Sequence, residues 1–266
     1  MTYVSAKGQR LFFQENGEGS PLILIHGLGA THDMWWPQIE AFSGRYRVIT
    51  YDCRGHGASS FVRPGNSLAD LGEDLVALLD HLQIPRAAIC GVSFGGVVAQ
   101  HFALAFPERC GALVIADSFS EVHALDSLGA WLQVPMLRVL PRPLLARLTA
   151  TAYPRKRWEL ARTEILKAGL TVRRQEVARL RALLNKVHLT QELWQILCPT
   201  LVVVGDRWAT MIRYAEIMHK AIPQSELSVI PDACDPSSLT NVEVFNRVVL
   251  DFLNRTYGSI DFARSQ

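Results

Sequence analysis

Five short runs of apolar residues recur along the chain and dominate its pattern. They are PLILIHG, RYRVITYD, RAAICG, ALVIAD and PTLVVVGD. A continuous apolar run of this length is typical of a β-strand that is buried on both faces. The stretches between the runs have a helical pattern, most clearly at 67–83, 93–108, 211–223 and 241–257. This alternation predicts an α/β protein with a mainly parallel, doubly wound sheet.

Three further segments complete a sheet of eight strands. TYVSA and RLFFQE alternate around KGQ and predict a hairpin, and SELSVIPD is a more polar strand candidate. From about 119 to 195 the chain has no strand pattern and is helix-like. We expect residues 119–195 to be a helical cap inserted into a core of residues 1–118 and 196–266. Ligands of open α/β sheets bind beyond the carboxyl ends of the strands, so the cap would close a pocket there.

Composition excludes several classes of protein. The 266 residues are 49% hydrophobic, which favours one large domain with an insertion. The formal net charge of +2 points to neither nucleic acid nor a membrane surface. Arginines cluster between 138 and 181, but acidic residues interrupt them, which predicts a solvated helical face. No apolar run reaches membrane-spanning length, and the N-terminus has no apolar signal core.

The cysteines and histidines indicate no metal site. The five cysteines include no CxxC pair, so we expect reduced thiols in a cytoplasmic protein. The scattered His and Cys residues predict no bound metal, and the chain lacks a dinucleotide fingerprint. We therefore expect a small-molecule substrate and no cofactor. The sequence does not give the oligomeric state.

The segment GVSFGG, residues 91–96, lies between a predicted strand and a predicted helix. In that context a G-x-S-x-G pattern is typical of a nucleophile elbow. Gly91 and Gly95 permit a cramped turn that lifts the Ser93 hydroxyl out of the sheet. The helix that follows directs its N-terminus at the site, which favours developing negative charge.

A second glycine motif, HGLG, follows the first long buried strand. Glycines there let backbone N–H groups approach a ligand closely. The N–H groups of Leu28 and Phe94 are the predicted oxyanion hole, which stabilises negative charge on a carbonyl oxygen.

Together these motifs resemble the α/β-hydrolase superfamily. The chain is similar to its capped branch, which includes enol-lactonases, esterases, haloperoxidase-like enzymes and C–C bond hydrolases. The matching pieces are LILIHGLGATHDMWWPQI, VITYDCRGHGASS, AAICGVSFGGVVAQHFALAFPERCGALVIADS and PTLVVVGDRWAT with the closing helix. The resemblance covers nearly the whole chain except the cap, and it implies the α/β-hydrolase fold.

In this sequence, both residues that assist the catalytic serine in this superfamily, the acid and the histidine, are replaced. The catalytic triad there runs serine, acid, histidine. The pattern places Trp208 of GDRWAT at the acid and Asp235 of VIPDACDPSS at the histidine. Residues 220–266 contain no histidine that could take its place.

Other residues are candidates for the missing groups. His123 follows the ALVIAD strand near the cap entrance, so it could be a relocated base, although a structural or pocket-lining role is the simpler interpretation. Asp117 ends that strand and is a candidate acid. Asp206 is another, although a loop-capping role is the simpler interpretation for it.

The two replacements also suit each other. A second carboxylate at position 208 would repel the negative charge of Asp235. An apolar Trp208 removes that repulsion, and it would desolvate Asp235 and raise the pKa of Asp235 toward the range of a general acid or base. An exposed Asp235 that starts an Asp-Pro turn is the competing interpretation.

A carboxylate activates a serine hydroxyl poorly. We therefore expect a non-hydrolytic enzyme, a lyase, cyclase or isomerase, in which Ser93 is a hydrogen-bond donor and Asp235 moves a proton. Its substrate would be a small, largely apolar carbonyl compound, since the cap is rich in Leu, Ala, Val and Trp, including Trp131 and Trp158. Two alternatives stay open. One is a serine hydrolase, an esterase or lactonase, with a relocated base, and the other is a catalytically silent ligand-binding protein.

Overall fold

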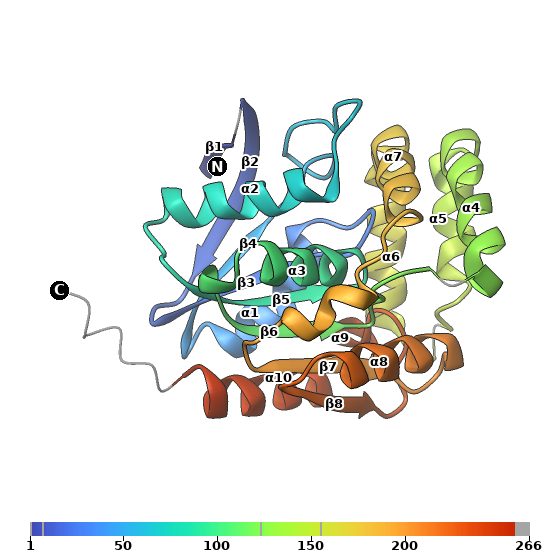
Figure 1. Ribbon diagram of the computed structural model, residues 1–266. Helices are drawn as coiled ribbons and strands as arrows, with labels where there is room; N and C mark the ends of the chain where they lie inside the picture. Colours follow the sequence, from blue (N-terminus) through green and yellow to red (C-terminus); the bar gives the residue numbers. More distant parts are fainter. Residues whose placement is uncertain (1, 7, 123, 155, 259–266) are drawn as a thin grey trace.

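The central feature of the computed structural model is one eight-stranded sheet (Figure 1). The structure describes residues 2–258, except 7, 123 and 155. The spatial strand order is β1-β2-β4-β3-β5-β6-β7-β8. Strand β2 is antiparallel to both of its neighbours, β1 and β4, and β3 to β8 run parallel to one another. This confirms the predicted fold. The strands are β1 (Thr2–Ala6), β2 (Gln9–Asn16), β3 (Ser20–Ile25), β4 (Tyr46–Tyr51), β5 (Ala87–Val92), β6 (Cys110–Ala116), β7 (Thr200–Gly205) and β8 (Ser225–Ile230).

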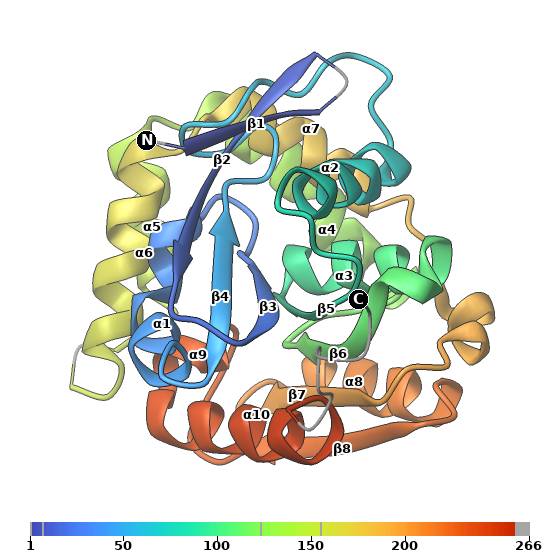
Figure 2. The same cartoon turned by 90° about the vertical axis from the view of Figure 1, so that its left-hand side faces the viewer.

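Helices cover both faces of the sheet (Figure 2). On one face lie α2 (Leu68–His81), α3 (Phe94–Ala105) and α8 (Ala209–Ala221), and on the other lie α1 (Trp36–Phe42) and α10 (Val242–Thr256). Strand side chains alternate between the two layers: Ile23 and Ile25 of β3 join the first core, and Leu22 and Leu24 join the second. Because both faces are buried, the central strands are apolar throughout, as their sequences indicated.

Four helices lie between β6 and β7 in the chain. They are α4 (Ala124–Val139), α5 (Arg142–Ala150), α6 (Glu159–Thr171) and α7 (Arg174–Leu184), followed by the short helix η3 (Thr190–Gln195). Figure 1 shows α4 to α7 beyond the carboxyl ends of the parallel strands, where a cap was expected. The boundaries of that cap at 119 and 195 stay a prediction. In the described part of the chain, no helix has the length and apolar character needed to cross a bilayer.

Two neutral histidines join the HGLG loop to the loop that follows β4. The His26 Nε2 atom accepts the Cys53 N–H at 3.0 Å, and the His56 Nε2 atom accepts the Gly29 N–H at 3.0 Å. An imidazole nitrogen can accept only while it is unprotonated. Burial lowers the pKa of both rings, and for His56 the nearby His26 helps to lower the pKa to about 3.

A buried ion pair fixes the same loop from its other side. Helix α2 begins at a capping box in which Ser67 and Asp70 bond each other's backbone N–H groups. One turn further on, Asp74 meets the Arg54 guanidinium in two hydrogen bonds of 2.6 Å, and both side chains are buried. Paired in this two-pronged way, the arginine holds the start of the loop against α2.

Replacing His56 by glutamine tests the neutral contact with Gly29. The glutamine carbonyl can accept that N–H at every pH, whereas histidine must stay uncharged. Between the folded pKa of about 3 and the unfolded value of about 6.5, the unfolded state binds more protons, so the native chain loses stability as the pH falls. Below pH 6, the free energy of unfolding of the native chain should fall by up to about 1.4 kcal/mol per pH unit more than that of the His56→Gln variant. Urea unfolding between pH 7 and pH 5 measures this, and parallel trends for the two proteins would contradict it.

Candidate active site

The turn at Ser93 has the strained geometry of an elbow. Ser93 lies between β5 and α3 with φ +55° and ψ −115°, a left-handed conformation that is rare for residues other than glycine. The backbone is crowded on both sides of the turn. A Cβ atom at Gly91 would lie 2.1 Å from the Gly95 carbonyl oxygen, and one at Gly95 would lie 2.2 Å from the Ile25 carbonyl oxygen. Only glycine fits at either position.

The HGLG loop lies directly beside this turn. A Cβ atom at Gly27 would be 3.8 Å from the Cβ of Ser93. Within the described residues, neither the Leu28 N–H nor the Phe94 N–H has a hydrogen-bond acceptor. Phe94 is also the first residue of α3, where unpaired N–H groups favour an anion. Both donors are thus available for the predicted oxyanion hole.

Asp235 lies next to Ser93. It follows β8, and the Ser93 side chain interacts with its carboxyl group. Burial and the charge of Asp117 hold the pKa of Asp235 well above its usual range, although the interaction with Ser93 acts in the opposite direction. From the cap, the Tyr153 hydroxyl donates to the backbone carbonyl of Asp235 at 2.5 Å. Asp235 is therefore no exposed turn residue.

Asp117 is the second carboxylate of the site. It follows β6 with φ +45°, and its two oxygens accept the Gly205 N–H at 2.9 Å and the Ser237 N–H at 2.5 Å. These bonds join the end of β7 to the segment that follows β8. Burial raises the pKa of Asp117, although its bonds from Ser237 and Gly205 act in the opposite direction. The pKa of Asp235 is raised well above its usual range, so in this close pair Asp235 is the carboxyl that holds a proton.

The expected role of Trp208 beside Asp235 stays a prediction. This residue precedes α8 and is 36% exposed. The repulsion that Trp208 was expected to remove is supplied by Asp117 instead. Asp206 accepts the Ala233 N–H at 3.2 Å, in keeping with a loop-capping role.

None of the described histidines bonds Ser93 or Asp235. His26 and His56 hold loops, and His81, His101 and His219 lie on α2, α3 and α8. His188 pairs with Glu121 and is largely exposed. His123, the candidate relocated base, lies outside the described residues. In the same part of the chain, no three His, Cys, Asp or Glu side chains gather to hold a metal ion.

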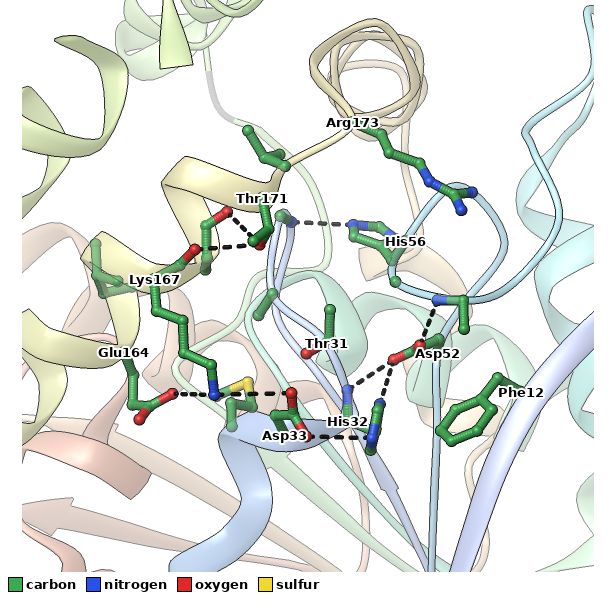
Figure 3. Close-up of a pocket in the computed structure, with 18 of the residues that line it drawn as sticks. Phe12, Thr31, His32, Asp33, Asp52, His56, Glu164, Lys167, Thr171 and Arg173 are labelled. Carbon is green, nitrogen blue, oxygen red and sulfur yellow. Dashed lines mark hydrogen bonds and ion pairs between the residues drawn. The ribbon is translucent and has the colours of Figure 1, made fainter. Parts of the chain in front are cut away.

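A cavity of about 490 Å³ adjoins this site (Figure 3). It lies between the HGLG loop, the loop after β4 and helix α6. Its lining includes Gly29, one residue after Leu28, and Pro236, one residue after Asp235. Ser93 and Asp235 are not part of that lining. The cavity therefore borders the HGLG loop and the loop that follows β8 from the side that faces α6.

The most polar wall of the cavity is built around His32 (Figure 3). Its Nδ1 atom lies 2.8 Å from an Asp52 oxygen, and its Nε2 atom lies 3.2 Å from an Asp33 oxygen. Burial lowers the pKa of His32, but the two carboxylates outweigh it and the pKa is raised. Lys167 of α6 lies 3.7 Å from Asp33 across the cavity. Sequence reasoning assigned His32 no role, because only the fold brings β4 and α6 to it.

Comparisons with known proteins agree with this geometry. The alpha/beta hydrolase fold family matches residues 20–242. The chain is 32% identical over 248 residues to 3-oxoadipate enol-lactonase 1 of Acinetobacter baylyi, which covers 89% of each chain. Among solved structures, the enol-lactonase from Burkholderia xenovorans LB400 has a TM-score of 0.86 at 25% identity, covering 95% of this chain and 100% of its own.

A thermophilic esterase from Thermogutta terrifontis is equally similar in structure. Its TM-score is 0.86 at 25% identity, and the match covers 96% of this chain and 98% of the esterase. The names of these relatives are those of hydrolytic enzymes, so they indicate a hydrolase-type enzyme here. With its elbow, its sheet order and a family match over most of its length, the chain belongs to the α/β-hydrolase family.

Proposed function

We propose that this enzyme moves protons on a small, largely apolar carbonyl compound, with Asp235 as general acid and base. The reaction would be that of a lyase, cyclase or isomerase. One observation carries the proposal: the Ser93 side chain lies beside a carboxyl whose pKa is held well above its usual range by burial and by the charge of Asp117. Such a carboxyl can act as a general acid and, once ionised, is a stronger base than an ordinary aspartate.

The oxyanion hole, Asp235 and Ser93 would each have a separate role in the reaction. The N–H groups of Leu28 and Phe94 hold the carbonyl oxygen of the substrate and stabilise the negative charge of an enolate. Asp235 removes the neighbouring C–H or O–H proton and later returns it. Ser93 donates its hydrogen bond and is not the nucleophile. A carboxylate is far less basic than an alkoxide and has no second nitrogen to relay the proton, so it would not drive acyl transfer.

A serine hydrolase is the second candidate, and the names of the relatives favour it. This function needs a base for Ser93. His123 is the candidate for that base, and it distinguishes the two proposals, because only the hydrolase depends on it.

A serine-directed fluorophosphonate separates the two candidates. We expect no stoichiometric labelling of the native chain within minutes, because Asp235 does not activate Ser93 for attack. In Asp235→His an imidazole would occupy the position beside Ser93, with Asp117 close by, and labelling should become at least about 100-fold faster. Intact mass spectrometry measures both rates, with Ser93→Ala as the unlabelled control. Rapid labelling of the native chain would overturn the non-hydrolytic proposal.

Proton transfer can be tested without the natural substrate. Small ketones in D₂O should exchange their α-protons in the presence of the enzyme, as followed by ¹H NMR. Asp235→Asn should slow this exchange by about 10²- to 10⁴-fold, the usual contribution of a general base. The matched control is Asp232→Asn, which changes a half-exposed carboxyl of the same loop and should leave the rate unchanged. Equal rates for both variants would rule out Asp235 as the base.

The pH dependence of exchange tests the carboxyl pair. As a base, Asp235 works when ionised, so the rate should rise with pH through its raised pKa. Asp117→Asn removes the neighbouring negative charge, which lowers the pKa of Asp235 and moves this rise to lower pH. The measured quantity is the pH at which the exchange rate is half-maximal. The loss of the bonds to Gly205 or Ser237 would alter only the maximal rate. A midpoint that stays in place would show that Asp117 does not set the pKa of Asp235.

A further inference from the structure

Helix α4 is apolar on two opposite sides. Ala130 and Val134 are buried, and Leu137 is half-buried on the same side. The outward side also carries large apolar residues, all exposed: Leu128 (72%), Trp131, Leu132 (60%), Met136 and Val139 (75%). At 3.6 residues per turn, the positions of these five residues fall within one arc of the helix surface. We call this surface the outer face of α4.

The position of α4 leaves this face uncovered by the residues that the structure describes. Figure 1 shows α4 at the far edge of the cap, and its packing partner is α7. A helix that is apolar all round is normally enclosed. A contiguous exposed apolar patch on a folded protein marks a surface that binds a partner or a membrane. The outer face of α4 therefore needs an occupant.

The charges of the cap indicate which occupant. Residues 127–158 contain six Lys and Arg residues and no Asp or Glu. Arg138 lies on α4 itself and Arg147 on α5, and both are exposed. The acidic residues that were expected to interrupt the arginine cluster begin only at Glu159. The first half of the cluster therefore has no acidic residue within the chain segment that carries it.

We propose that the outer face of α4 docks on an anionic lipid bilayer. A helix that lies in the membrane interface combines an apolar face, often with Trp, and Lys or Arg residues that meet anionic headgroups. The outer face of α4 supplies the apolar part, and Arg138 on the same helix and Arg147 on α5 supply exposed cations. The proposal replaces the expectation of no membrane partner, and it involves no helix that spans the bilayer.

A second copy of the chain fits this face less well. A two-fold contact would place the same patch against itself. Arginines would then face arginines, and residues 127–158 supply no carboxylate that could pair with them. An anionic surface instead satisfies the apolar residues and the cations together.

The inner side of α4 connects the outer face to the active site. Leu137 packs with Leu145 and Val172, and the same cluster includes Leu28 of the HGLG loop. A docked α4 would thus hold the oxyanion loop about one helix diameter, roughly 10 Å, from the membrane. An apolar substrate could reach the enzyme from the lipid phase. The docking itself does not depend on the chemistry at Asp235.

Vesicle co-sedimentation of the full chain tests the proposal. The vesicles are phosphatidylcholine alone, or phosphatidylcholine with about one third phosphatidylglycerol. We expect binding to the anionic vesicles, at least a tenfold loss of affinity in Leu128→Ser/Leu132→Ser, and a smaller loss in Arg138→Gln/Arg147→Gln. The matched control is Trp194→Ser/Leu197→Ser, which removes two equally exposed apolar side chains outside α4 and should bind as the native chain does. Circular dichroism checks that each variant is folded.

Three results would overturn the proposal. One is that the native chain fails to bind either kind of vesicle. A second is that the control pair weakens binding as much as the α4 pair does. The third is a dimer in size-exclusion chromatography that Leu128→Ser/Leu132→Ser dissociates, which would assign the outer face to a second copy.

Discussion

The close approach of three backbone segments at Gly95 is the constraint on which the active site depends. There the start of α3 lies so near the end of β3 that a Cβ atom would be 2.2 Å from the Ile25 carbonyl oxygen. This contact places the HGLG loop, which continues from β3, beside Ser93. The proposed oxyanion hole, formed by the N–H groups of Leu28 and Phe94, would thus depend on main-chain packing and not on the side chains around it.

Main-chain contacts also position the carboxyl pair of Asp117 and Asp235. In a serine hydrolase, the residue at position 235 would be an imidazole oriented by an acid. Here Asp117 accepts backbone N–H groups from the end of β7 and from Ser237 after β8, so the fold fixes the position of its carboxyl group. That fixed charge helps to keep the proton on Asp235. A group that connects two loops therefore also sets the protonation of its neighbour.

Much of this could be predicted from the sequence, and the limits have physical reasons. The strands and the elbow were predictable, because burial on both faces requires continuous apolar runs and a cramped turn requires glycines. The position of Asp235 followed from the order of motifs. The influence of Asp117 on the pKa of Asp235 was not predicted, because loop side chains are oriented by long-range contacts that no local pattern encodes. The surroundings of His32 and the bond from Tyr153 depend on such contacts too.

The cap is more than a cover for the pocket. Tyr153 and Trp158 donate to the backbone carbonyls of Asp235 and Asp232, so the cap holds the loop that carries the proposed base. Helix α4 belongs to the same cap, and through Leu137 it packs into the cluster that includes Leu28. A shift of α4 on binding at its outer face would therefore reach the HGLG loop through packed side chains. An enzyme with an apolar substrate would gain from this arrangement, because the proposed docking surface and the proposed base would be held by one set of helices.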